Sequence, residues 1–497
     1  MKSLRQVQTT RKQYHVDPKR RTVHRSSLLV PHVPGCTPIL SFVNHFLLKR
    51  NYPNVACKIM AIDASGNLAD SITEPVTEPR AYSIELERKF GFAAHNYVVE
   101  FHCADNLFIP FPAAMINHSD ARFCNVVHSY NRVLNDVFED DDINRKVVDE
   151  ASIDVVNDAA TETFFVFSSG IAPVEAPLHI ELSVDGKRYA AEFPVHMDRL
   201  SNRIIGISQV FPGLETLQGG VIRIRQPKQP MFFGRLLAGV RSKSGVAFSA
   251  NHSFYDSSTA PEYWQGDTSS RTYPFFSGFR NAIRMYPIMS PGRLDLSVEF
   301  SGPDGTVRTL EAGSVLSPSD RFAEIDVNAL LEAAGAGQTA SYRVLARAAE
   351  GGAPTRITHQ LVISDAAGQS PMQASLAVGL NNPEAFAPPN RRGYTWGQMA
   401  VGSSYASKIG LVWDSPDGEA DDVELEFYSA AGKIAAMTLR LQPRGAILLA
   451  QGDLPASLRA RPLDFIWFIA KSRRADLNAY SVHRNMASGH CSGEHGF

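Results

Sequence analysis

Long apolar runs are missing from this sequence of 497 residues. Because no stretch of about 18 apolar residues exists, no transmembrane helix is expected. The N-terminus also lacks the apolar stretch that a secretory signal requires. We therefore expect a cytoplasmic protein with no membrane span.

Cysteine is scarce, and its spacing shows no CxxC pair. An odd number of scattered cysteines argues against a disulfide framework and against a structural zinc knuckle. We expect reduced thiols. The five cysteines are Cys36, Cys57, Cys103, Cys124 and Cys491.

Several catalytic signatures are absent as well. The sequence contains no GxxxxGK[ST] loop, no GxGxxG after a strand, no GxSxG elbow and no HExxH zinc motif. These absences argue against a nucleotide-dependent enzyme and against an α/β-hydrolase. A formal net charge of −2 argues against a nucleic-acid partner.

The sequence does contain the pattern that is typical of β-strands. Short runs rich in Val, Ile, Phe and Tyr enter glycine-containing turns and leave as further runs. Helical periodicity is scarce and is clearest at 128–161, with a shorter case at 326–334. The four clearest turns are ASGN at 64–67, DGK at 185–187, GPDG at 302–305 and AAGK at 430–433.

A repeat of about 116 residues organises the chain. Four segments read as strand, polar turn, strand and polar exit, at 116–131, 240–256, 362–383 and 469–485. The pattern and period resemble tandem immunoglobulin-like modules, and this resemblance implies no functional residues. We therefore predict an all-β protein of about four tandem immunoglobulin-like β-sandwich domains with short linking helices.

The predicted boundaries follow composition shifts and Pro/Gly-rich joints. We expect a basic flexible arm at 1–27, a sandwich with a trailing helix at 28–160, and sandwiches at 161–270, 271–390 and 391–497, the last with a His/Cys-containing tail. The basic arm could dock on the acidic run at 139–142 of the same chain or of a neighbour.

Three of the four segments exit at a histidine: His128, His252 and His483. Three histidines suggest a metal site. Equivalent positions in a linear array of domains lie about one domain diameter apart, whereas metal–nitrogen bonds need about 2.1 Å. A structural role for each histidine is therefore the favoured interpretation, and only a strongly curved arrangement would change it.

The C-terminus SGHCSGEHGF concentrates metal-donor residue types in one short segment: His490, Cys491, Glu494 and His495. A transition metal is the one cofactor that this pattern suggests, and otherwise none is expected. The alternative is a terminal peptide that docks into a neighbouring domain or subunit with Phe497 as an apolar anchor.

Two further groups are candidate ligand-binding residues. Arg223 and Arg225 are two positions apart in a predicted strand, so both point to one face and could hold anionic groups. Tyr255, Tyr263 and Trp264 lie in polar loops and could stack on sugar rings. The alternatives are a solvated face whose arginines pair with acids, and rings that pack a domain joint.

These observations lead to a non-catalytic binding or assembly protein whose partner is a protein or a saccharide. Homo-oligomers could form through the terminal tails. The alternative is a metal-dependent enzyme on a β scaffold, with ligands near the C-terminus or in the first domain. A carbohydrate-active enzyme with Asp256 and Glu262 as paired acids is a third hypothesis.

Overall fold

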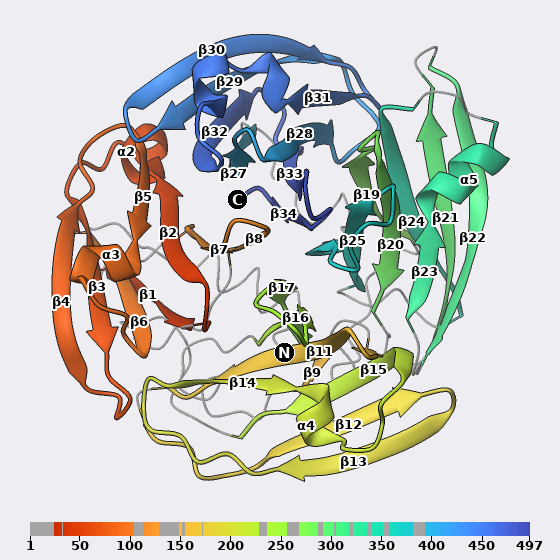
Figure 1. Ribbon diagram of the computed structural model, residues 1–497. Coiled ribbons are helices and arrows are strands. Elements are labelled where there is room, and N and C mark those ends of the chain that lie inside the picture. The colour runs from red at the N-terminus through yellow and green to blue at the C-terminus, as the bar shows by residue number, and fades with distance from the viewer. Residues whose placement is uncertain are drawn as a thin grey trace. The chain divides into compact units, whose positions relative to one another are not determined.

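The structure is a computed structural model that describes residues 24–31, 33–103, 113–128, 149–151, 155–170, 172–227, 236–255, 268–286, 292–302, 305–317, 322–335, 339–350, 357–380 and 393–497. These residues form antiparallel sheets with four short α-helices, which confirms the predicted all-β fold (Figure 1). Within them the chain makes four successive copies of one two-sheet unit, here called repeats 1 to 4.

The strands of repeats 1 and 2 occupy the first half of the chain. Repeat 1 contains β1 His24–Pro31, β2 Thr37–Val43, β3 Val55–Ile62, β4 Leu68–Pro75, β5 Ala81–Glu85, β6 Asn96–Cys103, β7 Met115–Ser119 and β8 Cys124–Val127. Repeat 2 contains β9 Asp149–Ala151, β10 Val155–Asn157, β11 Thr161–Ser168, β12 Leu178–Val184, β13 Lys187–Phe193, β14 Asn202–Gly206, β15 Leu217–Arg225, β16 Leu237–Ser242, β17 Phe248–His252 and β18 Phe254–Tyr255.

The second half of the chain contains the other two repeats. Repeat 3 contains β19 Thr268–Pro274, β20 Phe279–Met285, β21 Gly292–Ser301, β22 Val307–Ser317, β23 Ala323–Asp326, β24 Ser341–Glu350, β25 Ile357–Asp365 and β26 Ala374–Leu380. Repeat 4 contains β27 Gly393–Val401, β28 Tyr405–Trp413, β29 Asp421–Ser429, β30 Gly432–Leu441, β31 Ala446–Ala450, β32 Asp464–Ser472, β33 Leu477–Asn485 and β34 Cys491–His495.

Each repeat has the same strand order. When its strands are counted from one to eight, one sheet has the order 1-6-3-4 and the other 5-2-7-8. In repeat 2, β10 takes the first position and also pairs with β11, so that the two sheets join into one of ten strands. An immunoglobulin constant domain has the order 1-2-5-4 and 3-6-7. The resemblance to such domains therefore extends to the sandwich architecture and not to the strand order.

The four predicted turns are the same hairpin in the four repeats, between the third and fourth strands. In repeat 2 the hairpin closes with Val184 paired to Lys187, and the two residues between them, Asp185 and Gly186, have φ values of 50° and 72°. Positive φ at both central positions defines a type I′ turn, whose twist matches that of the flanking strands.

Short helices connect strands inside the repeats. They are α2 His45–Arg50, α3 Leu86–Phe90, α4 Ile207–Val210 and α5 Val327–Ala333. The helix predicted at 326–334 is confirmed as α5, where the Asp326 side chain accepts a hydrogen bond from the Ala329 amide. The trailing helix predicted at 128–161 is wrong for the residues that are described, because β9 and β10 pair with β15 and belong to repeat 2.

Both sheets of a repeat contribute to one hydrophobic core. The core of repeat 4 combines Met399 and Ile466 from one sheet with Leu411 and Ala479 from the other. The core of repeat 3 continues beyond its own strands, because Val412, Tyr480, Val482 and Cys491 of repeat 4 pack against it. Repeats 3 and 4 therefore share buried apolar surface instead of each burying only its own.

The chain divides into two compact units, 1–121 with 126–255 and 122–125 with 256–497. In the first unit, repeats 1 and 2 are joined by Asn96, which donates a hydrogen bond to the Leu200 carbonyl at 3.1 Å and accepts one from Asn202 at 2.8 Å. No helix among the described residues is long and apolar enough to cross a membrane.

Candidate functional site

The eighth strand of three repeats leads to a histidine at its end. His128 directly follows β8, His252 is the last residue of β17 and His495 is the last residue of β34. In repeat 3 the corresponding strand, β26, ends at Leu380. The histidine therefore recurs at one topological position, the end of a strand that lies at a sheet edge in the described residues.

The assignment of His483 as the exit histidine of the fourth segment is wrong. His483 lies within β33, the seventh strand, opposite Ser407 of β28 and Ser492 of β34. It is buried, and burial lowers the pKa of its imidazole to about 3, with His490 contributing in the same direction. The fourth sequence segment, 469–485, was aligned one strand too early. The cause is that the two successive strands β33 and β34 each contain a histidine among polar residues.

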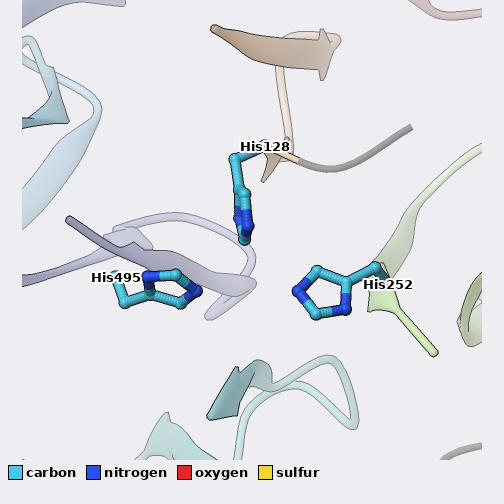
Figure 2. A group of neighbouring side chains, drawn as sticks. All are labelled: His128, His252 and His495. Atoms are coloured by element: carbon cyan, nitrogen blue, oxygen red, sulfur yellow. The ribbon is translucent and has the colours of Figure 1, made fainter. Parts of the chain in front are cut away.

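His128 and His252 lie side by side in the first unit (Figure 2). Their ring centroids are 5.0 Å apart with an interplanar angle of 86°, and a ring nitrogen of one lies within 4.8 Å of a ring nitrogen of the other. The expectation that equivalent histidines lie a domain diameter apart is therefore wrong for repeats 1 and 2. Two edge strands that end near each other bring the residues together.

The tautomer of His252 follows from its hydrogen bond. Its Nδ1 lies 3.1 Å from the carbonyl oxygen of Ser253, and since a carbonyl only accepts, Nδ1 carries the proton and donates. The Nε2 atom then carries the lone pair. His495, which Figure 2 also labels and which belongs to the second unit, makes the same local hydrogen bond from Nδ1 to the carbonyl of Gly496 at 2.9 Å.

The predicted C-terminal ligands lie in and next to a β-strand instead of a flexible tail. Because successive strand residues point to opposite faces, Cys491 and His495 share one face of β34 and Glu494 lies on the other. Cys491 packs into the core shared with repeat 3, and burial raises the pKa of its thiol to about 12. A protonated thiol is a poor metal ligand. His490 is buried just before the strand, where its carbonyl accepts from the Asn485 amide at 2.9 Å.

The predicted anchor, Phe497, packs within its own repeat. Its ring lies 5.7 Å from that of Trp396 on β27 and 6.3 Å from that of Trp467 on β32, nearly parallel to the latter. Its backbone amide donates to the Trp396 carbonyl at 2.9 Å. The C-terminal residues thus complete repeat 4.

Arg223 and Arg225 lie on β15, the sixth strand of repeat 2. Ile222 and Ile224 between and beside them belong to the core, so the two arginines are on the opposite, outer face. Arg225 is exposed and Arg223 is half-buried. In the strand register, Arg223 lies opposite Glu181 on β12, an arrangement that allows a cross-strand ion pair.

The predicted aromatic site is described only in part. Tyr255 is the last residue of β18, which pairs with β9. Tyr263 and Trp264 lie outside the described residues, as do Asp256, Glu262, the acidic run at 139–142 and most of the basic arm, since β1 begins at His24.

All five cysteines are free thiols and buried. The sequence contains no signal for the proximity of His128 and His252. It marks both as repeat exits, but the pairing of repeats 1 and 2 depends on contacts such as the Asn96 hydrogen bonds, which no local pattern shows.

Comparisons with known proteins give little additional information. No family model matches the chain, and no curated protein matches it. Among solved structures, a "tetra-tandem repeat in extending region of large adhesion protein" is similar at 10% identity, with 89% of this chain and 91% of that chain covered and a TM-score of 0.08. Such a low score carries no argument about function.

Proposed function

We propose that this chain is a non-catalytic binding or assembly protein that presents the same strand surface four times. The observation that carries the proposal is the position of the fourth strand in every repeat. β4, β13, β22 and β30 each stand at the end of a sheet and, among the described residues, pair along one side only.

These four strands are more exposed than the strands beside them. Nearly every residue of β4 and β13 is exposed or half-buried, whereas every second residue of β12 is buried. The unpaired side of an edge strand offers backbone donors and acceptors to an extended segment of another chain. A protein partner is therefore the occupant that this geometry favours, and a second copy of the chain is the simplest such partner.

Hydrogen–deuterium exchange of the full chain tests the proposal. Sedimentation over a range of concentrations first establishes whether the chain self-associates. In the associated state, amides of β13 and β30 are expected to become protected while those of the central strands β12 and β29 stay unchanged. A chain that remains monomeric at all concentrations and recovers no partner in a pull-down contradicts the proposal.

A saccharide partner would use a different surface, the outer face of β15. Arg223 and Arg225 lie on this face about 7 Å apart along the strand, and two guanidinium groups at this spacing suit sulfate or carboxylate groups on a sugar. A glycan array with sulfated and neutral sugars tests this use. The double variant Arg223→Ala/Arg225→Ala should lose sulfated ligands, while Arg188→Ala on the exposed strand β13 should not.

A metal-dependent enzyme is the second candidate function, and the His128–His252 pair is the observation that favours it. A catalytic ion must keep a coordination position open for substrate. Addition of azide to cobalt-loaded protein discriminates: a changed visible spectrum indicates an open position, whereas an unchanged spectrum removes this candidate.

A further inference from the structure

The end of the eighth strand is a place where two repeats contribute the same residue type to one location. β8 and β17 are both edge strands, and the histidines at their ends, His128 and His252, come from repeats 1 and 2. His252 is 2% exposed and His128 is half-buried. A shared position for two partly desolvated imidazoles requires a chemical reason, because each ring brings polar nitrogen atoms into the protein.

Metal coordination supplies such a reason. Two nitrogen atoms bound to one tetrahedral zinc ion at about 2.1 Å lie about 3.4 Å from each other. One ring nitrogen of each histidine lies within 4.8 Å of one of the other, which is close to this separation.

The orientation of His252 also suits a metal ligand. Metal-bound histidines usually donate their other ring N–H to a carbonyl or carboxylate, which fixes the tautomer and the direction of the lone pair. Nδ1 of His252 donates to the Ser253 carbonyl at 3.1 Å, and the ring lone pair therefore lies on Nε2. The equivalent residue of repeat 4, His495, makes the same hydrogen bond to the next residue in its own unit. The histidines at the ends of β17 and β34 therefore have the same tautomer.

We propose that His128 and His252 bind a divalent transition-metal ion, with zinc as the preferred ion, and that this ion cross-links repeats 1 and 2. Imidazole ligands suit zinc, cobalt, nickel and copper, whereas magnesium and calcium prefer oxygen. This cross-linking role does not depend on the proposed binding function. The remaining coordination positions are filled by water or by donors beyond this pair.

Cobalt titration of the full chain tests the site directly. The protein is prepared without a polyhistidine tag and freed of metal with EDTA. The wild-type chain should bind Co²⁺ with a visible d–d spectrum, and zinc should displace it. His128→Gln and His252→Gln should each weaken binding about 100-fold, at least as much as the loss of an outer-shell partner. Saturating zinc should raise the melting temperature of the wild type by about 5 °C.

A matched control separates the pair from adventitious histidines. His179 lies on β12 in the same unit with an exposed side chain, and His179→Gln should bind Co²⁺ like the wild type. The half-buried His128 provides the safer variant if His252→Gln fails to fold, which circular dichroism in EDTA reveals. The proposal is overturned if the wild type shows no d–d spectrum, if folded His128→Gln binds as the wild type does, or if His179→Gln is equally impaired.

Discussion

The guanidinium group of Arg271 on β19 donates a hydrogen bond of 2.8 Å to the hydroxyl of Tyr480 on β33 and so joins repeat 3 to repeat 4. The same group donates to the Gly379 carbonyl at 3.0 Å and to the Asn478 side chain at 3.2 Å. Tyr480 is buried. One arginine therefore satisfies three polar atoms from two strands, β26 and β33, at the boundary between two repeats.

Replacement of this arginine should destabilise the second unit. We expect Arg271→Ala to lower the free energy of unfolding by about 2–4 kcal/mol, because the buried Tyr480 hydroxyl loses its donor and the other two acceptors lose theirs. Urea unfolding measures the change. Arg280→Ala provides the control, since Arg280 is more than half exposed and its ion pair with Asp326 should contribute less than about 1 kcal/mol. Equal losses of unfolding free energy in the two variants would show that the Arg271 contact between the repeats stabilises the unit no more than an exposed ion pair does.

The type I′ turn of repeat 2 supports a second prediction. Gly186 has a φ of 72°, and a Cβ atom at this position would meet no neighbour within 4 Å. Gly186→Ala should therefore cost about 1 kcal/mol through backbone strain alone. Gly452→Ala is the matched control, because a Cβ there would also meet nothing and Gly452 does not have a positive φ. Thermal unfolding of both variants measures the difference, and a neutral Gly186→Ala would mean that the turn is not of this type.

Glu426 on β29 makes the stability of repeat 4 depend on pH. Burial alone would raise the pKa of this carboxyl group, but hydrogen bonds from Lys471 at 2.8 Å, Lys433 at 3.0 Å and Tyr428 at 3.0 Å hold its pKa at about 2. The carboxyl group thus binds its proton more weakly in the folded chain than in the unfolded chain. Its contribution to stability is present above about pH 5 and is lost as the pH falls toward 2.

The corresponding variant is Glu426→Gln. It should lower the free energy of unfolding by about 1–2 kcal/mol at pH 7 and by much less at pH 2.5. The loss at pH 7 is modest because the two lysines are partly exposed and solvent screens their interaction with the carboxylate. Denaturant unfolding at the two pH values measures this. Glu424→Gln on the same strand, at an exposed position, should show no such difference. A loss that is the same at both pH values would contradict the pKa assignment.

The C-terminal strand β34 supplies a test of the metal ligands predicted there from the sequence. Cys491→Ser should leave Co²⁺ binding unchanged, because the thiol is buried and its pKa of about 12 keeps it protonated. Absorption titration with Co²⁺ measures this, and weaker binding by Cys491→Ser would show that the thiol is a ligand.

Local chemistry alone determined much of the architecture. The alternation of apolar residues and the turns at 64–67, 185–187, 302–305 and 430–433 mark the same hairpin in each repeat, because a hairpin forms between neighbours in the chain and its turn type depends on a few residues. The aspartate that begins α5 is equally local. Such features repeat with the chain period, and so the number of sandwich units also followed from the sequence.

Only the tertiary structure decided which distant elements meet. The first strand of each repeat pairs with the sixth, across most of the repeat, and no short pattern specifies that partner. The same limit explains the predicted trailing helix, in whose range the described residues include β9 and β10, and the exit histidine assigned to His483 instead of His495. His128 and His252 are 124 positions apart in the chain. They meet because packed surfaces and the Asn96 hydrogen bonds hold repeats 1 and 2 together, which is a balance of long-range contacts that residue order does not display.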